Sequence, residues 1–184
     1  VLSSPAWLDS FTDNLNGTAT LAGTPDNGDL GTASNAVTLQ VTDFAGVTID
    51  QAFTINVDNA NDQPVFTSTG ITAVNEDAPY TYNITSSDPD AADTRTITAL
   101  SIPACLTLSD VTTDGSATLS GIPLNADVGA ASVVLAVTDA LGAAENQSFS
   151  ITVANTNDAP AFTSDPVTAA LQDIAYTYNI TTAD

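Results

Sequence analysis

Positive charge is almost absent from this chain of 184 residues. Its only cation is Arg95, against 22 carboxylates, so the formal net charge is −21. Such a surface cannot neutralise phosphates, which argues against a nucleic-acid partner. It also repels anionic membrane surfaces, and no apolar run approaches the roughly 18 residues needed to span a bilayer. We therefore expect no membrane insertion in this segment.

Histidine and lysine are also missing, and Cys105 is the only cysteine. The chain therefore has no ordinary base with a pKa near neutrality, no Schiff-base amine and no activated thiol. These absences predict that it is not an enzyme, and they argue against zinc or copper sites. Oxygen ligands from Asp, Asn, Glu and the backbone remain, and these suit hard cations such as calcium.

Hydrophobic residues make up 43% of the chain, which is too many for a solvated coil. We therefore expect a folded scaffold that holds the acids, with divalent cations or high salt offsetting their repulsion. The sequence starts at Val1 and shows no signal-peptide pattern. This start indicates a window within a longer chain.

An internal repeat organises the sequence. The motif at 61–64, Asn-Asp-Gln-Pro, returns as Asn-Asp-Ala-Pro at 157–160, a shift of 96 residues. Tyr-Thr-Tyr-Asn-Ile-Thr at 80–85 returns letter for letter at 176–181 with the same shift. One complete unit therefore spans about residues 64–158.

Further upstream the shift between repeats becomes 98. Pro5-Ala6-Trp7-Leu8 matches Pro103-Ala104-Cys105-Leu106, so an insertion of two residues must lie between, near 32–36. Trp7 and Cys105 occupy equivalent positions next to a leucine, and we predict that both are core residues. The repeat divides the chain into 1–58 (the later part of a unit), 59–63 (a linker), 64–154 (a complete unit), 155–159 (a linker) and 160–184 (the start of a third unit).

Each unit has the pattern of an all-β domain. Tyr80, Tyr82 and Ile84 alternate with polar residues, as in a half-buried strand. Turn-forming residues separate several such runs, and no stretch shows a helical period with caps. The pattern predicts tandem immunoglobulin-like β-sandwiches. The other strands that we expect are 96–100, 117–119, 133–137 and 149–153.

The complete unit resembles the cadherin-like repeats of the dystroglycan type, related to bacterial immunoglobulin-like repeats and found in large prokaryotic surface proteins. The motifs that carry the resemblance span the unit: Ser87-Asp88-Pro89-Asp90, Ile102 to Leu106, Gly115 to Pro123, Asn125 to Gly129, Val137-Thr138-Asp139 and Ala154 to Pro160. The resemblance implies immunoglobulin/cadherin-like sandwiches joined end to end, with calcium at the junctions.

The acids gather where such junctions would lie. Calcium takes six to eight oxygens at about 2.3–2.6 Å, and one short linker with the loops beside it can supply them. For the first junction we expect ligands from the linker, from the loop after the strand at 80–85 and from the turn after the strand at 133–137. These candidates are Asp58, Asn59, Asn61, Asp62, Asp88, Asp90 and Asp139.

Cadherin-like sites also draw on acids of the preceding domain. At the first junction only Asp29 is available for this role. At the second junction the candidates are Glu76, Asp127, Asn155, Asn157, Asp158 and Asp184, the last being equivalent to Asp88. Gln172 stands where Glu76 has its counterpart in the third unit, a departure from the pattern.

Any single Asp or Asn in a turn is more often a turn-former than a ligand. The set above differs because its spacing recurs and because its charges would repel one another without a cation. Arg95 is the expected local partner of Asp93 or Asp88. From these features we predict a structural repeat of an extracellular, cell-surface fibre, stalk or adhesin in which calcium stiffens the junctions.

A carbohydrate-binding or cell-adhesion module is the alternative, with a polysaccharide or cell-surface ligand as its partner. Sugar sites usually need aromatic residues in a row, and here the aromatics alternate inward or stand alone. The ends suggest a further partner. Residues 160–184 carry the first two strands of a sandwich, and 1–58 carry the later ones. We expect neighbouring copies to join head to tail, with one segment completing the other.

Overall fold

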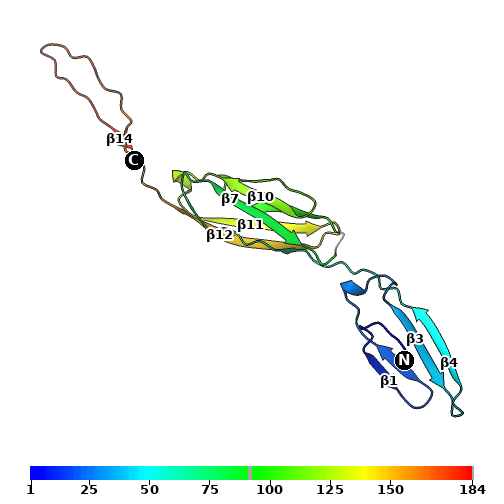
Figure 1. The fold of residues 1–184 in the computed structure, drawn as a ribbon. Coiled ribbons are helices and arrows are strands. Elements are labelled where there is room, and N and C mark those ends of the chain that lie inside the picture. The colour runs from blue at the N-terminus through cyan, green and yellow to red at the C-terminus, as the bar shows by residue number, and fades with distance from the viewer. Residues whose placement is uncertain (91–92, 184) are drawn as a thin grey trace.

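The computed structural model describes residues 1–90 and 93–183 (Figure 1). We call residues 1–58 the first segment, 64–154 the central sandwich and 160–183 the C-terminal hairpin. Nearly all regular structure consists of strands, which confirms the predicted all-β fold. No helix among the described residues is long and apolar enough to cross a membrane.

The central sandwich consists of two four-stranded sheets that face each other (Figure 1). One sheet has the order β5-β7-β10-β9 and the other β6-β12-β11-β8; only β6 and β12 pair in parallel. A short 3-10 helix, η2 (Asn125–Asp127), precedes β11. The strands are β5 (Val65–Phe66), β6 (Ala73–Asn75), β7 (Tyr80–Ser87), β8 (Arg95–Ser101), β9 (Leu106–Ser109), β10 (Ser116–Gly121), β11 (Gly129–Asp139) and β12 (Ala144–Ala154).

Period-two alternation builds the core between these sheets. Along β7, Tyr80, Tyr82 and Ile84 are buried while the residues between them face solvent. Tyr82 pairs with Leu119 of β10 and meets the Phe149 ring edge-on, with centroids 5.8 Å apart. Other buried residues of this core are Ile97, Leu106, Ala117, Val133, Leu135, Val137, Ile151 and Val153.

The first segment repeats the later strands of the central sandwich. It forms two separate two-stranded sheets and a 3-10 helix equivalent to η2. Its apolar side chains are largely uncovered, and Val41 and Ile49 are more than half exposed. The elements are β1 (Ser10–Asp13), β2 (Ala19–Ala22), η1 (Asn27–Asp29), β3 (Ala36–Thr42) and β4 (Thr48–Thr54).

The two extra residues of the first segment lie between η1 and β3. Gly31 forms a bridge with Val57, and in the central sandwich Gly129 pairs with Val153. Gly31 and Gly129 are 98 residues apart in the sequence, whereas Val57 and Val153 are 96 apart, so the two extra residues lie between Gly31 and Val57. The longer loop, residues 32–35, carries Asn35, which is fully buried.

The C-terminal hairpin repeats the pairing of β5 with β7. Its strands β13 (Ala161–Phe162) and β14 (Thr182–Ala183) pair Phe162 with Thr182, as Phe66 pairs with Ser86. We expected residues 176–181 to form a strand, as the equivalent run does in β7. In the structure, only residues 182–183 have strand geometry in this arm of the hairpin. The equivalent run in β7 is held straight by β10, and no described residue takes that place beside 176–181.

Trp7 and Cys105, both predicted to be core residues, are half-buried. Both follow a proline turn at the end of their unit, outside the alternating strands that fill the core. The adjoining leucine of the central sandwich, Leu106, is buried instead. The prediction of a core position therefore holds in part for Cys105, which packs against the core while it stays half-buried.

Candidate metal centre

The loop after β7 turns on its own acids. The Asp88 Oδ1 atom accepts a hydrogen bond from the N–H of Asp90 at 2.9 Å, and the N–H of Asp93 donates to the Asp90 carbonyl at 2.9 Å. Pro89 fixes the backbone between the first two acids. This turn brings three carboxylates of one short loop to the end of the sandwich.

Asp139 ends β11 and is anchored from two sides. Its Oδ1 atom accepts hydrogen bonds from the N–H groups of Leu141, Gly142 and Ala143, at 2.6–2.9 Å. Its Oδ2 atom accepts from the Asn61 side chain in the linker at 2.8 Å. The Asn61 bond and these backbone bonds hold the pKa of Asp139 below its ordinary value. Asp139 is only 7% exposed, and its lowered pKa favours the ionised form despite this burial.

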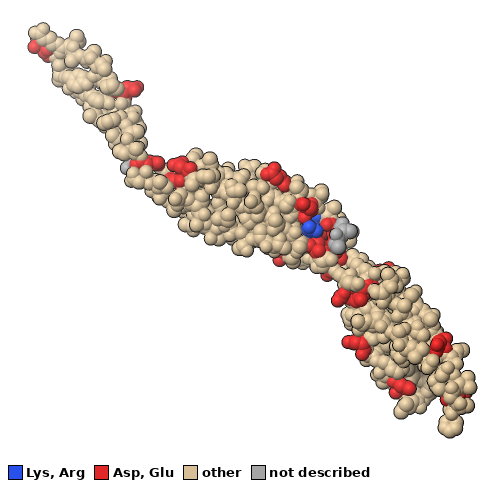
Figure 2. All heavy atoms as spheres, in the orientation of Figure 1, with Lys and Arg blue, Asp and Glu red and all other residues tan. Residues whose placement is uncertain are grey.

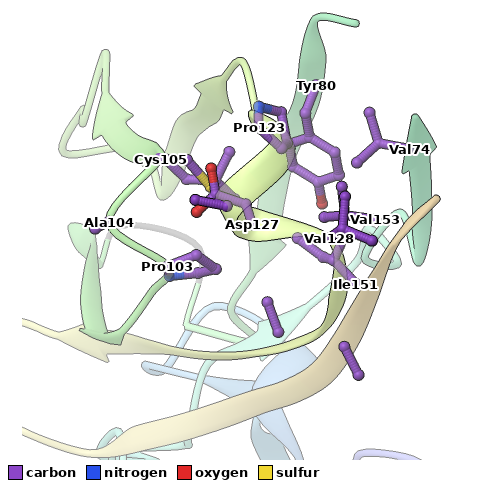
Figure 3. A pocket seen from close by; sticks show the side chains of 14 residues that line it. Val74, Tyr80, Pro103, Ala104, Cys105, Pro123, Asp127, Val128, Ile151 and Val153 are labelled. Atoms are coloured by element: carbon purple, nitrogen blue, oxygen red, sulfur yellow. The ribbon is translucent and has the colours of Figure 1, made fainter. Parts of the chain in front are cut away.

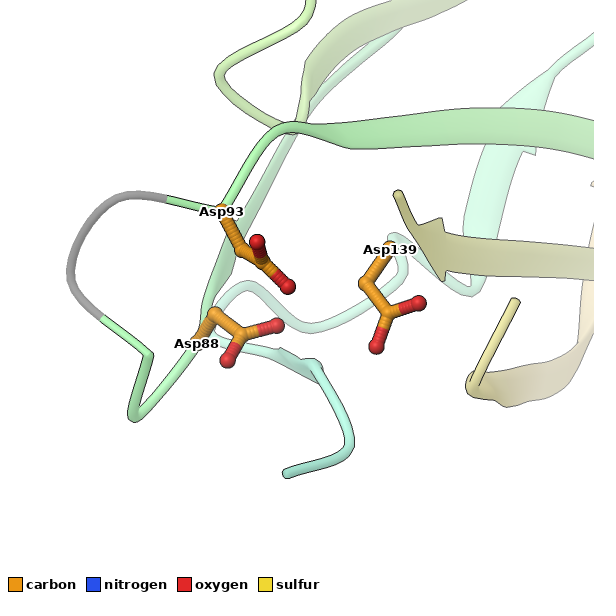
Figure 4. A group of neighbouring side chains, drawn as sticks. All are labelled: Asp88, Asp93 and Asp139. Atoms are coloured by element: carbon orange, nitrogen blue, oxygen red, sulfur yellow. The ribbon is translucent and has the colours of Figure 1, made fainter. Parts of the chain in front are cut away.

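Asp88, Asp93 and Asp139 converge on one point. Each offers a carboxylate oxygen within 4.8 Å of the others, and their side chains turn toward a shared space (Figure 4). Burial, and then the charges of Asp139, Asp88 and Asp90, raise the pKa of Asp93, while Arg95 opposes them. The site therefore concentrates negative charge that the protein itself does not balance.

Arg95, the single cation, lies beside this group of acids (Figure 2). We expected Asp93 or Asp88 to be its local partner. Asp93 is a partner through its backbone, since the guanidinium donates to the carbonyls of Asp93 (3.2 Å) and Asp114 (2.5 Å) and to the Ser86 hydroxyl (3.4 Å). Arg95 thus holds the loop's backbone in place and leaves the carboxylates open.

Three carboxylate oxygens of the loop are buried without a hydrogen-bond partner: Asp88 Oδ2, Asp90 Oδ1 and Asp93 Oδ2. Asp90 is 6% exposed, and its other oxygen accepts the N–H of Asp62 at 2.8 Å. Buried polar groups in native proteins nearly always have partners, and an unpaired buried charge is costly. The donor set is therefore oxygen-only, anionic and unsatisfied, which fits a hard divalent cation such as calcium.

Asp62 of the first linker contacts both neighbours. Its N–H donates to Asp90 of the central sandwich, and its Oδ2 atom accepts the Asn27 side chain of η1 at 2.7 Å. Two other expected ligands accept local hydrogen bonds. Asp29 accepts the N–H of Asp26 and caps η1, whereas Asp58 accepts the Asn56 side chain. Asn59 is exposed.

The second junction repeats part of this arrangement. Asn125 of η2 donates to Asp158 Oδ2 at 3.1 Å, as Asn27 does to Asp62. Glu76 is 2% exposed; its Oε1 atom accepts the N–H of Thr156, and its Oε2 atom is buried without a partner.

The remaining candidates at this junction make local hydrogen bonds or are exposed. Asp127 accepts the N–H of Leu124 and caps η2. Asn157 donates to the Asp158 carbonyl, and Asn155 is exposed. Asp184 lies outside the described residues. Glu76 and Asp158 are thus the acids that the structure ties to this linker.

Asp93 is the site residue that the sequence reasoning missed. It was treated as the partner of Arg95, although it is the third acid of one short loop. The signal was present in the spacing Asp88, Asp90, Asp93. Its role depends on which way the loop turns, which the alternation of strands does not determine.

The sequence from residue 63 to 154 matches the family described as "Putative Ig domain", which is half of the chain. The chain belongs to this family. The match coincides with the central sandwich and includes its loop acids. No curated protein sequence matches the chain.

Solved structures with a similar fold include two protocadherins. The extracellular cadherin domains of protocadherin gamma B2 align with a TM-score of 0.58 and 17% identity, over 84% of this chain and 31% of that one. For protocadherin gamma B7 the TM-score is 0.56 and the identity 22%, over 84% and 41%. These likenesses support the immunoglobulin/cadherin-like fold of the family.

An endo-fucoidan hydrolase of glycoside hydrolase family 107 aligns with 30% identity and a TM-score of 0.46, over 84% of this chain. The alignment covers 23% of the hydrolase. The chain thus spans less than half the length of each of these three proteins.

Proposed function

We propose that this chain is a non-catalytic structural repeat of an extracellular, cell-surface protein and that calcium stiffens the junctions between its domains. The observation that carries the proposal is the set of three buried, unpartnered carboxylate oxygens on the loop of Asp88, Asp90 and Asp93. A calcium ion would supply the missing partner for these oxygens and for Asp139. Calcium tolerates the irregular geometry that loops provide.

Stiffening follows from the position of Asp62. This linker residue is bonded both to Asp90, beside the acid cluster, and to Asn27 of the first segment. Without a cation, the acids repel one another, and this repulsion destabilises the loop whose Asp90 binds Asp62. With a cation, the loop and Asp139 are held together, and the linker is fixed to them through Asn61. The range of angles between neighbouring domains should then become narrower.

Calcium titration tests this proposal. We expect saturable binding by calorimetry, a lower thermal midpoint in EDTA, and a broader distribution of interdomain angles in small-angle scattering. Asp90→Ala combined with Asp139→Ala should reproduce the effect of EDTA at the first junction only. The matched control is Asp43→Ala, since Asp43 is the exposed counterpart of Asp139 in the first segment. Equal midpoints and scattering curves with calcium and with EDTA would contradict the proposal.

We also infer that neighbouring copies join head to tail through the C-terminal hairpin. In the central sandwich, β10 pairs with β7 so that Ala117 faces Ile84 and Leu119 faces Tyr82. In the first segment, the equivalent strand β2 pairs only with β1 among the described residues. Open strand edges bind further strands readily.

The repeat gives the register of this pairing. Shifting the β10–β7 partners by their repeat offsets places Ile180 of one copy opposite Ala19 of the next, and Tyr178 opposite Leu21. A groove of about 680 Å³ on the first segment includes Ala19 of β2 in its lining, together with apolar residues such as Phe11 and Leu39 and several polar ones. The exposed apolar side chains of the hairpin match this surface in chemistry.

Disulfide trapping tests the register. In a Cys105→Ser background, a Thr20→Cys chain mixed with an Asn179→Cys chain should form mixed dimers, because this pair is directly opposite. Thr177→Cys is the matched control, displaced by two residues on the same face. Equal yields from the two mixtures, or only monomers by sedimentation, would refute the head-to-tail inference without affecting the calcium proposal.

A further inference from the structure

The central sandwich contains a cavity of about 320 Å³ that the proposed function does not use (Figure 3). Most of the side chains that line it are apolar, among them Ile151 and Val153 from the core, and polar atoms share its surface with them. Cys105 and Asp127 add a thiol and a carboxylate, and Tyr80 adds a hydroxyl that already donates to the Ile71 carbonyl at 2.9 Å. Volumes of this size and lining of this kind are typical of small-molecule sites.

In the first segment, Trp7 stands where the cavity has Cys105. The turn is the same, since Leu8 donates to the Pro5 carbonyl at 3.1 Å and Leu106 to the Pro103 carbonyl at 3.0 Å. The neighbouring glycines agree as well. A Cβ at Gly23 would meet the Trp7 carbonyl, and one at Gly121 would meet the Cys105 carbonyl. The side chains of Trp7 and Cys105 therefore leave the same point of the fold.

Trp7 shows what this position accommodates. Its indole N–H donates to Asn35 Oδ1 at 2.8 Å, and Asn35 is fully buried. The Asn35 side chain in turn donates to the carbonyls of Asp29 and Gly31. An aromatic ring with one N–H donor thus has a place and an acceptor at this end of the fold.

The central sandwich lacks both halves of that pair. A thiol replaces the indole, and the loop that carries Asn35 is two residues shorter, with Ala130 and Ala131 in its place. Cys105, Ala130 and Ala131 all line the cavity. The cavity therefore lies where a ring and its amide partner stand in the first segment.

We propose that this cavity binds a small aromatic molecule that carries an N–H or O–H donor, with indole as the simplest example. The apolar walls accept the ring, and Asp127 is the acceptor for its donor. One Asp127 oxygen already accepts the N–H of Leu124, but a carboxylate can accept several hydrogen bonds. Because the chain carries a net charge of −21, an aromatic anion should be rejected.

The test is a titration of the full, 15N-labelled chain with indole, followed by NMR. Saturable shifts should appear at amides around the cavity, such as those of Val128, Ala131 and Ile151. Indole should also slow the labelling of Cys105, the only thiol in the chain, by a thiol reagent. The matched probe is indole-3-acetate, which has the same ring and a negative charge and should bind at least tenfold more weakly.

Two variants close the cavity from different walls. Cys105→Trp puts the ring of the first segment into the space, and Ala131→Leu narrows it from β11 while keeping the thiol. In either variant that keeps a native spectrum, indole binding should be lost. Three results would overturn the proposal: no shifts up to the solubility limit of indole, shifts spread over the surface, or binding that survives both variants.

Discussion

The same six residues, Tyr-Thr-Tyr-Asn-Ile-Thr, occur in the central sandwich at 80–85 and in the C-terminal hairpin at 176–181. Their local hydrogen bonds are nearly identical. The Tyr82 hydroxyl bonds with the Ser68 hydroxyl at 2.8 Å, and Tyr178 bonds with Ser164 at 2.8 Å. These bonds form within one hairpin, so they need nothing from the rest of the sandwich.

Burial separates the two copies. Ile84 is 1% exposed and Ile180 61%, while Tyr80 is 2% exposed and Tyr176 53%. Only the central copy also forms a long strand, because β10 pairs along its length. The sequence of a hairpin thus determines its local bonds, whereas strand length and burial come from partners distant in the sequence.

The largest expected effect comes from truncating the equivalent isoleucines of the two copies. Ile84→Ala removes a fully buried side chain from between the two sheets and should lower the free energy of unfolding by about 2–5 kcal/mol. Ile180→Ala removes the same atoms from an exposed site and should cost almost nothing in the isolated chain. Urea unfolding of both variants measures the difference.

A significant loss in Ile180→Ala at low protein concentration would break the comparison, because it would mean that the hairpin is covered within its own chain. A loss that appears only as concentration rises would instead support the head-to-tail inference. Thr181→Ala, on the outward side of the same run, is the matched control.

The second test compares two equivalent glycines. Gly115 and Gly17 both adopt left-handed backbone, with φ of +79° and +83°. A Cβ at Gly17 meets nothing within 4 Å, but one at Gly115 would lie 2.1 Å from the Ser86 hydroxyl and 2.8 Å from Arg95 Nε. In both Ala variants the left-handed backbone conformation should lower the free energy of unfolding. Gly115→Ala should lower it by about 1–3 kcal/mol more, through overpacking.

Amide exchange in β10 and β2 reports each change in its own segment. Because the extra atom at Gly115 would displace Arg95, calcium binding should weaken in that variant alone. Equal losses of stability at the two glycines would mean that the side chains of Ser86 and Arg95 can move aside without cost. Arg95 would then not position the loop of Asp88, Asp90 and Asp93.

Strand positions, the repeat and the clustering of acids near a junction could all be predicted from the sequence, since they follow from period-two alternation and recurring motifs. The arrangement within the site could not. Asp93 joins the cluster through the turn of its loop, and Arg95 bonds to carbonyls of residues 93 and 114. Such features arise from contacts between segments and leave no local pattern.

A third test exchanges two equivalent residues, Glu76 and Gln172. Glu76 is buried, and its Oε2 atom has no partner, whereas Gln172 is exposed in the hairpin. In EDTA, Glu76→Gln should stabilise the central sandwich by on the order of 1 kcal/mol, because it removes an unpaired buried charge. With calcium the same variant should lose the stabilisation that the wild type gains. The matched control Gln172→Glu should change neither value, and a wild-type response to calcium in Glu76→Gln would exclude Glu76 as a ligand.

The smallest expected effect concerns the alkaline limit of the central sandwich. Burial, then the neighbouring Tyr82, raise the pKa of Tyr80 from 10.0 to about 12, although its hydroxyl donates to the Ile71 carbonyl. A raised pKa favours the protonated form in the folded state, so this contribution is complete below pH 10 and is lost as the pH rises toward 12. Tyr80→Phe should therefore flatten the fall of stability with pH in this window, at the cost of one hydrogen bond at neutral pH.

Tyr176 makes the same bond to Val167 in the hairpin, but its ring is exposed. Tyr176→Phe should leave the alkaline profile unchanged, and an equal flattening in both variants would show that burial does not distinguish the two copies.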